Sequence, residues 1–295
     1  MDSAGKTRVT TAPDTSGFSA HVLIDGRFCL DEPIGRGTAA YVWRATDLAS
    51  LEKVAVKIFS LPLGHAPQGH EAAREALALR SIADPHVVGL VTDGTISHPA
   101  TGVQTPYLVL ELVSGQNLRQ VLAGTFPGQA VDAARLGAEL AAGLCAIHAA
   151  GYIHRDIKPS NILVNAGTGS AKIADLGAAS SSLTAASGTS SYGSLPYMSP
   201  EQVLGAGLDS ATDIYSLGLV LLECLTGARA FDLPQVESMV VRTVRSPELP
   251  GTLPAGWRSL LSGMTSISPK DRPTAAECRS ALAALAAGTG ALRAA

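Results

Sequence analysis

The sequence contains no long run of lysine or arginine, no closely spaced cysteines and no long apolar segment. The net charge is -3, so the composition gives no sign of a nucleic-acid partner. The longest apolar run, residues 217–225, is about half the length of a membrane span and contains Glu223. The opening residues, MDSAGKTRVTTAPDTSG, lack the apolar centre of a signal peptide. We therefore expect no membrane span.

The cysteines point to a reduced compartment. They are Cys29, Cys145, Cys224 and Cys278, which are widely separated and lack the spacing of a metal site. Isolated cysteines of this kind are typical of intracellular proteins, so we expect a cytoplasmic location. Of the 295 residues, 46% are apolar, which is enough for one large domain or two close-packed lobes.

The pattern of the chain predicts an α+β protein. Residues 1–20 are rich in Ser, Thr, Gly and Pro and are expected to form a mobile tail. Residues 21–113 contain short strand-like segments such as KVAVKIF and YLVLELV, with one helix, GHEAAREALALRSI, between them. Residues 114–288 contain long helices rich in Ala and Leu, and 289–295 form a short tail. The sequence thus predicts a strand-rich lobe followed by a helical one.

The segment YIHRDIKPSNILV places several charged and polar side chains between apolar runs. Asn161 is expected to open a strand, NAGTGS a turn, and residues 171–175 the returning strand. This hairpin should bring Asn161 opposite Asp175, an oxygen pair that suits Mg²⁺ shared with a phosphate. Asp156 and Lys158 lie just upstream. Surface-paired charges on a hairpin would explain any one of these residues, but not the whole set.

A glycine-rich segment, residues 34–42, lies between two predicted strands. Gly35 and Gly37 would let backbone N–H groups approach phosphates closely. Alone, the pair is equally typical of an ordinary turn. It differs from a Rossmann fingerprint because a strand follows it, and it lacks the Gly-Lys-Ser/Thr of a P-loop.

Lys57 ends an apolar strand. A lone lysine there either extends to the surface or points inward, where it needs an anionic partner. The next helix offers Glu71 and Glu75 one turn apart, and periodicity does not choose between them.

Taken together, the motifs resemble those of eukaryotic-type protein Ser/Thr kinases of the bacterial kind, over residues 27–285. They are the Gly-rich loop, Val54-Ala-Val-Lys57, His154-Arg155-Asp156 with Asn161, Asp175-Leu-Gly177 and Ser199-Pro-Glu201. The resemblance implies a two-lobed kinase fold, with a small antiparallel-sheet N-lobe that holds one key helix and a larger, mainly helical C-lobe. It also implies Mg-ATP as the phosphate donor and proteins as substrates.

The resemblance assigns roles to matching positions. Asp156 would accept the proton of the substrate hydroxyl, Lys158 would steady the phosphate, and Asn161 and Asp175 would hold Mg²⁺. Lys57 would bind phosphates and pair with the helix glutamate, and the family's spacing to the DPHVV segment favours Glu75 over Glu71. The positions expected around ATP are Ile34, Gly35, Arg36, Gly37, Thr38, Val42, Ala55, Lys57, Leu110, Glu111, Val113 and Leu163. Glu201 would pair with Arg272, and Asp213 would brace the catalytic loop.

The chain departs from the family pattern without losing a catalytic group. Ala40 replaces the third loop glycine, Leu176 replaces a phenylalanine and Ser199 replaces an alanine. Lys158, two residues after Asp156, indicates Ser/Thr rather than Tyr as the target. The alternatives are an ATP-binding pseudokinase scaffold and a small-molecule kinase. The Ser199-Pro-Glu201 segment and the loop before it argue against the second, because they form the protein-substrate platform in the family.

The loop AASSSLTAASGTSSY, residues 178–192, carries eight Ser or Thr residues and no charge. It could be a plain linker. However, the Arg155 guanidinium needs an anion that the loop supplies only when it is phosphorylated. We therefore expect autophosphorylation, first at Thr189 and then at Thr184, Ser187 or Ser190, with a homodimer as one way to achieve it in trans.

Overall fold

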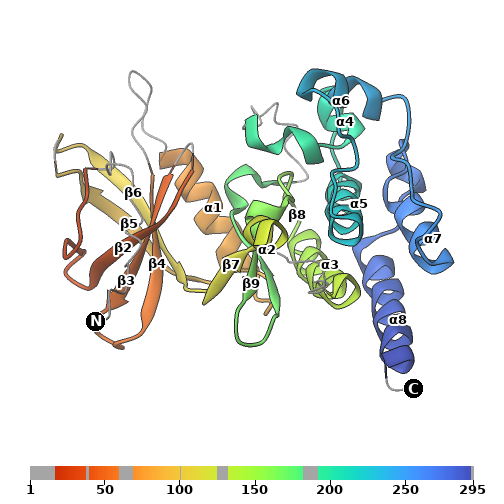
Figure 1. Ribbon diagram of the computed structural model, residues 1–295. Helices are drawn as coiled ribbons and strands as arrows, with labels where there is room; N and C mark the ends of the chain where they lie inside the picture. Colours follow the sequence, from red (N-terminus) through yellow and green to blue (C-terminus); the bar gives the residue numbers. More distant parts are fainter. Residues whose placement is uncertain are drawn as a thin grey trace, which may run out of the picture. The chain divides into compact units, whose positions relative to one another are not determined.

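The structure is a computed structural model that describes residues 17–37, 40–59, 69–99, 101–124, 132–181 and 192–293 (Figure 1). The chain divides into two compact units by its contacts. Unit 1 is Met1–Ala72 with Val91–Leu112, and unit 2 is Ala73–Leu90 with Val113–Ala295. The division falls within α1 (Gly69–Ser81), so most of this helix is grouped with the second unit. The predicted lobe boundaries stay a prediction.

Unit 1 is built on a six-stranded sheet with the strand order β1-β2-β3-β4-β6-β5. Neighbours pair antiparallel from β1 through β4 to β6. The strands are β1 Leu23–Ile24, β2 Phe28–Arg36, β3 Ala40–Asp47, β4 Lys53–Phe59, β5 Leu90–Ser97 and β6 Gln104–Glu111. β4 has a β-branched residue at every second position from Val54 to Ile58, and all residues after its first are buried, as in the centre of a sheet.

Aromatic and aliphatic side chains on one face of this sheet form the core of unit 1. Phe28 and Leu30 of β2, Trp43 of β3 and Tyr107 of β6 all belong to it. Just before β2, Arg27 pairs with Asp47 at the end of β3, through Nη2 and Oδ2 at 2.6 Å. The sheet that the sequence predicts for this part of the chain is therefore present.

Unit 2 is mainly helical (Figure 1). Its helices after α1 are α2 Leu118–Gly124, α3 Ala133–Ala149, α4 Pro200–Val203, α5 Ala211–Thr226, α6 Gln235–Arg242, α7 Ala255–Met264 and α8 Ala275–Arg293. Asp132 caps α3 by accepting a hydrogen bond from the Arg135 N–H. Gly227 ends α5 in the left-handed conformation, and its N–H bonds the Glu223 carbonyl. Trp257 of α7 is buried in this unit.

Short strands in unit 2 frame the segments of chemical interest. They are β7 Gly115–Asn117, β8 Tyr152–Ile153, β9 Ile162–Asn165, β10 Ala171–Ile173 and β11 Ser180–Ser181. β9 and β10 form the predicted hairpin, and the Asn165 side chain accepts the N–H groups of its turn. Asn161 does not open the strand, because Pro159 starts a 3-10 turn over Pro159–Asn161 and β9 begins one residue later.

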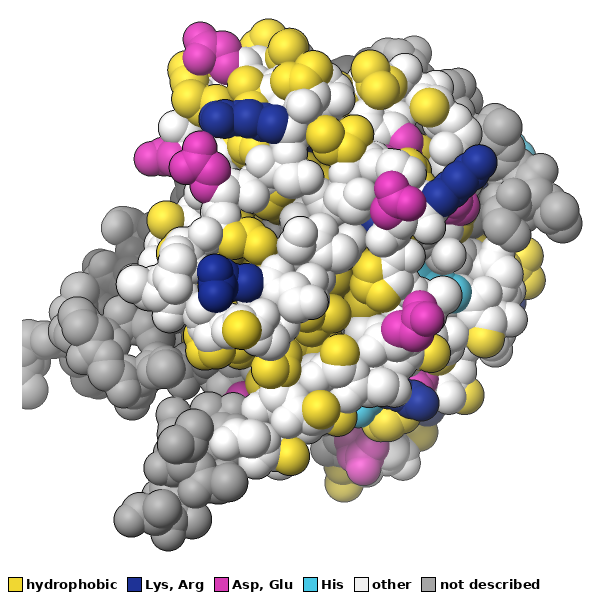
Figure 2. All heavy atoms as spheres, turned by 90° about the vertical axis from the view of Figure 1, so that its right-hand side faces the viewer, with side chains coloured by type: hydrophobic (Ala, Val, Ile, Leu, Met, Phe, Trp, Pro, Cys, Tyr) yellow, Lys and Arg dark blue, Asp and Glu magenta, His cyan; other side chains and the backbone are white. Residues whose placement is uncertain are grey.

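The α+β prediction is confirmed, with the antiparallel sheet preceding the helices. Among the described residues, no helix is long and apolar enough to cross a membrane. Figure 2 views the molecule from the side on which α7 and α8 lie in Figure 1. In the coloured part of that face, acidic and basic side chains are scattered among hydrophobic and uncharged ones.

Candidate active site

A buried carboxylate holds the loop that follows β8. Asp213 of α5 accepts the backbone N–H of His154 at 2.9 Å and that of Arg155 at 2.8 Å, and His148 Nε2 of α3 lies 2.8 Å from Oδ2. Burial by itself would raise the pKa of Asp213, but the contacts with His148 and the loop hold that pKa below its usual value. The bracing role expected of Asp213 is thus matched by its contacts.

The loop has a backbone conformation that needs such support. Arg155 has φ 69°, a left-handed value that is uncommon for a residue with a side chain. Such a conformation costs about 1–3 kcal/mol and persists only where surrounding contacts impose it. Arg155 immediately precedes Asp156, so the left-handed backbone of Arg155 sets the direction in which the chain enters Asp156.

The structure brings Asp156, Lys158 and Asn161 together. Asp156 Oδ2 accepts from Lys158 Nζ at 2.7 Å and from Asn161 Nδ2 at 3.0 Å. Asn161 Nδ2 also donates to the Asp156 carbonyl at 2.9 Å. In contrast, Asp156 Oδ1 is buried and has no hydrogen-bond partner among the described residues. A buried polar atom of this kind is rare and points to a ligand group such as a hydroxyl.

The two expected magnesium ligands lie at the base of the hairpin. The Ala174 N–H donates to the Asn161 carbonyl at 2.8 Å, which joins the two ends of the hairpin as predicted. Asp175 is left-handed at φ 64° and accepts from the Gly177 N–H at 3.4 Å. Because Asn161 gives its Nδ2 to Asp156, its Oδ1 remains suited to a cation. No group of three or more His, Cys, Asp or Glu suited to a metal occurs in the described ranges. An amide oxygen and a carboxylate are donors of the kind that suits a Mg²⁺ completed by phosphate and water.

The expected nucleotide-binding residues of unit 1 share neighbouring strands. The sheet register sets Gly35 beside Val42, Val42 beside Lys57, and Ala55 beside Leu110. The Gly37 N–H donates to the Ala40 carbonyl at 2.8 Å.

The other expected residues of this group are divided between the units. Ile34 and Arg36 also belong to β2 and Glu111 to β6, whereas Thr38 lies outside the described residues. Leu163 pairs with Asn117 and Lys172 in unit 2, and Val113 is also in that unit.

Lys57 and Glu75 are both buried, whereas Glu71 is half-buried. They belong to different units, so their pairing stays a prediction. Burial of Glu75 agrees with its choice over Glu71, because a buried carboxylate requires partners.

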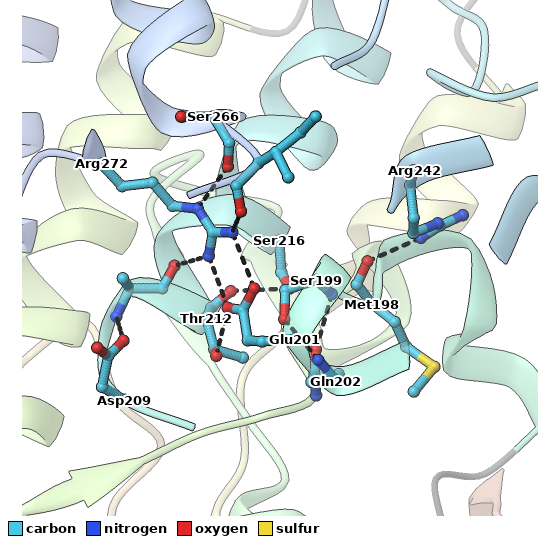
Figure 3. A network of polar contacts seen from close by, with 12 residues as sticks. Met198, Ser199, Glu201, Gln202, Asp209, Thr212, Ser216, Arg242, Ser266 and Arg272 are labelled. Atoms are coloured by element: carbon cyan, nitrogen blue, oxygen red, sulfur yellow. Dashed lines mark hydrogen bonds and ion pairs between the residues drawn. The ribbon is translucent and has the colours of Figure 1, made fainter. Parts of the chain in front are cut away.

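A polar network anchors residues 197–202, here called the platform segment (Figure 3). The Arg272 guanidinium donates to both carboxylate oxygens of Glu201, at 2.6 and 2.8 Å, as predicted. Thr212 Oγ1 donates to Glu201 Oε1 at 2.8 Å, and Arg272 also donates to the Ser266 carbonyl. Burial alone would raise the pKa of Glu201, but Arg272 holds it below its usual value.

Three further contacts to the platform segment were not predicted from the sequence. Arg242 of α6 is fully buried and donates to the Met198 carbonyl at 2.8 Å (Figure 3). The Tyr197 hydroxyl donates to Glu223 Oε2 at 2.5 Å and accepts from Arg119 Nη2 at 2.6 Å. No motif marks these residues. The one sign in the sequence is that Arg242 directly follows the short apolar run at residues 239–241 of α6. The predicted phosphorylation sites Thr184, Ser187, Thr189 and Ser190 lie outside the described residues.

Comparison with known proteins agrees with this geometry. The sequence matches the protein kinase domain family over residues 28–282. It is 36% identical to the probable serine/threonine-protein kinase PknB of Corynebacterium glutamicum, over 71% of this chain and 33% of that protein. It is 34% identical to the serine/threonine-protein kinase PknA of Mycobacterium tuberculosis, over 81% of this chain and 56% of that protein. The serine/threonine-protein kinase PknB of the same species is 32% identical to it, over 88% of this chain and 43% of that protein.

The chain thus spans between about a third and just over half of the length of these relatives. The family match covers nearly all of the described chain, and the antiparallel sheet and helical unit are those of the two-lobed kinase fold. The chain therefore belongs to the protein kinase family, and to its bacterial, eukaryotic-type serine/threonine kind.

Proposed function

We propose that the chain is an active protein serine/threonine kinase that transfers the γ-phosphoryl group of Mg-ATP to hydroxyl groups of protein substrates. One observation carries the proposal: Asp156 Oδ1 is buried without a hydrogen-bond partner among the described residues, while Oδ2 is held by Lys158 and Asn161. This leaves one carboxylate oxygen to accept a hydrogen bond from a substrate hydroxyl. A pseudokinase scaffold has no need of such an oxygen.

Each residue has a defined task in this proposal. When bound, Mg-ATP supplies the phosphoryl group and the metal charge that offsets the negative charge on the phosphates. Asp156 orients the substrate hydroxyl and takes its proton, and Lys158 steadies the phosphate. Asn161 and Asp175 hold the metal ion by their side-chain oxygens.

The remaining expected residues bind the nucleotide. Lys57, paired with Glu75, binds the phosphates that are left on the nucleotide. The surroundings of ATP are Ile34, Gly35, Arg36, Gly37, Thr38, Val42, Ala55, Leu110, Glu111, Val113 and Leu163. The strand pairings of Val42 with Lys57 and of Ala55 with Leu110 support this set.

The wider organisation is part of the same proposal. The N-lobe comprises residues 21–113 and the C-lobe 114–288, with tails at 1–20 and 289–295. Proteins are the substrates, because the platform segment is held by the Glu201–Arg272 pair that serves this purpose in the family. All four cysteines are free, which supports a cytoplasmic location. Autophosphorylation of the loop at residues 178–192, in trans within a homodimer, would activate the enzyme.

The test uses Asp156→Asn, which keeps the size of the side chain and removes its basic oxygen. With labelled ATP and a generic protein substrate, we expect phosphate transfer to fall at least about 100-fold. Nucleotide affinity, measured by calorimetry, should change by less than about 3-fold. Lys57→Met should also abolish transfer. Asp232→Asn, the same change at an exposed site, serves as the control and should behave as the wild type.

Two outcomes contradict the proposal in different ways. Near-normal transfer by Asp156→Asn defeats the assignment of the base. A wild-type protein that binds Mg-ATP without transferring phosphate is a scaffold instead.

A further inference from the structure

Gln202, the residue after Pro-Glu in the platform segment, uses both ends of its side-chain amide. Its Oε1 accepts the Ser199 N–H at 2.9 Å, and its Nε2 donates to the Arg155 carbonyl at 2.8 Å. The two amide ends cannot be exchanged, because one partner is a backbone donor and the other a backbone acceptor. Gln202 therefore joins the start of α4 to the loop that carries Asp156.

The carbonyl that Gln202 holds belongs to the strained residue of the site. Arg155 has φ 69°, and its N–H is already bound by Asp213 Oδ1 at 2.8 Å. Its carbonyl is half of the peptide that leads into Asp156. With the Arg155 N–H held by Asp213 of α5 and the carbonyl held by Gln202 of α4, the peptide units on both sides of Arg155 are fixed, so its φ and ψ cannot change freely. The Asp156 N–H, which belongs to the same peptide unit as the Arg155 carbonyl, donates to His154 Nδ1 at 3.2 Å.

The other end of Gln202 is tied to an anchored segment. Ser199 Oγ accepts the Gln202 N–H at 3.3 Å, so Ser199 and Gln202 form a reciprocal helix cap. Between them, Glu201 is fixed by Arg272. A displacement of the platform segment would thus move Gln202, and with it the Arg155 carbonyl.

We propose that Gln202 is a positioning residue that couples the platform segment to the orientation of Asp156. The proposal rests on the phosphotransfer function proposed above. It accounts for the residue type, since the cap needs an acceptor, the Arg155 carbonyl needs a donor, and a side-chain amide supplies both. A glutamate would serve the cap equally well but could not donate to the carbonyl.

Two substitutions separate the two bonds. Gln202→Glu keeps the acceptor for Ser199 and loses the donor, whereas Gln202→Lys keeps a donor and loses the acceptor. We expect Gln202→Glu to lower kcat about 10-fold with less than about 2-fold change in KM for ATP, because misdirection of the base slows the chemical step. Gln202→Lys should stay within about 3-fold of the wild type.

The chain offers a matched control at the start of α2. Gln120 and Asn117 form the same kind of reciprocal cap, with the Asn117 N–H donating to Gln120 Oε1 at 3.0 Å and the Gln120 N–H to Asn117 Oδ1 at 2.9 Å. Gln120 is exposed and has no bond to the catalytic loop in the described part of the chain. Gln120→Glu makes the same change of charge in the same kind of cap, and should leave kcat unchanged.

A second measurement does not depend on activity. Hydrogen–deuterium exchange of the peptide spanning residues 152–158 should be faster in Gln202→Glu and unchanged in Gln202→Lys and Gln120→Glu. The coupling is overturned if Gln202→Glu keeps the kcat and the exchange rate of the wild type. It is also overturned if kcat falls equally in both Gln202 variants, because the loss would then not depend on the donor to the Arg155 carbonyl. If the wild type transfers no phosphate, the proposed function fails, but the exchange comparison still decides whether Gln202 orders the loop.

Discussion

Arg242 is the least expected residue of the structure, a fully buried guanidinium with no carboxylate among its contacts in the described chain. It donates to the Ser238 carbonyl at 3.0 Å, to the Ser238 hydroxyl at 2.5 Å and to the Met198 carbonyl at 2.8 Å, and it stacks over Phe231 at 5.2 Å. Burial lowers the pKa of Arg242. Neutral oxygens and a ring therefore replace the ion pair that a buried cation usually needs.

We predict that Arg242→Lys lowers the free energy of unfolding by about 1–3 kcal/mol, because an ammonium cannot reproduce the fork of donors or the stacking. Urea unfolding followed by circular dichroism measures the change. Arg245→Lys, three residues later at an exposed position, should cost less than about 0.5 kcal/mol. Equal effects of the two substitutions would show that Arg242 is not held by its geometry.

At this scale, sequence predicts residues within one motif better than residues that meet across elements. Asp156, Lys158 and Asn161 lie within a few positions of one another, so their spacing alone placed them together. Arg119, Tyr197 and Glu223 come from separate elements, and nothing in their local sequence indicates that they meet. The platform segment and its partner Arg272 are recognisable in the sequence, but the supporting side chains of Arg119, Glu223 and Arg242 are not.

Among the elements, α3 and α8 show how a glycine can have opposite effects in two helices. A Cβ on Gly143 of α3 would lie 2.9 Å from the His86 carbonyl oxygen and 3.1 Å from Ile173 Cδ1. The helix therefore passes too close to the backbone of the DPHVV segment for any side chain. Gly288 of α8 has nothing within 4 Å of the same position and is exposed.

We predict that Gly143→Ala destabilises the protein by about 1–3 kcal/mol, since the clash is with backbone that cannot simply rotate away. Gly288→Ala should stabilise it by about 0.5–1 kcal/mol, because alanine restricts the unfolded chain and favours the helix. Thermal unfolding of both variants beside the wild type tests the pair. A stabilising Gly143→Ala would mean that α3 is free to move from its neighbour.

Elements were predictable in proportion to their length. The long helices α3 and α5 and the strands β4 and β6 have clear periodicity or continuous β-branched runs, and all of them are present. Strands of two or three residues, such as β8 and β11, carry no measurable period. They form because tertiary contacts align them, as in the pairing of Ser180 with Ile153.

At the scale of the whole molecule, four carboxylates among the described residues link folding to pH. The bond from Arg27 lowers the pKa of Asp47, and bonds from Thr274 lower that of Glu277. For Glu201 and Asp213, burial acts in the opposite direction, but Arg272 and His148 outweigh it and lower the pKa. A carboxylate with a pKa lower in the folded than in the unfolded state stabilises the fold above its unfolded pKa, and the stabilisation is lost as pH falls toward the folded pKa.

We therefore predict that the urea midpoint falls steadily as pH is lowered from about 5 to 3, the range in which carboxyl groups of the unfolded chain bind protons while those with a lowered pKa in the fold stay ionised. Glu201→Gln should be less stable than the wild type at pH 7, and the difference should shrink in acid because one of the linked carboxylates is gone. Gly143→Ala changes no ionisable group and should follow a curve parallel to the wild type. A constant gap between Glu201→Gln and the wild type would contradict the linkage.

The two tryptophans of the sequence are divided between the compact units, Trp43 in the sheet of unit 1 and Trp257 in α7 of unit 2. Both indoles are buried, so each should emit at short wavelength in the native protein and shift to the red when its own core opens. The intrinsic fluorescence is accordingly the sum of two optical reporters. Trp43→Phe silences one and Trp257→Phe the other, so each variant gives a spectrum that follows a single core of this kinase.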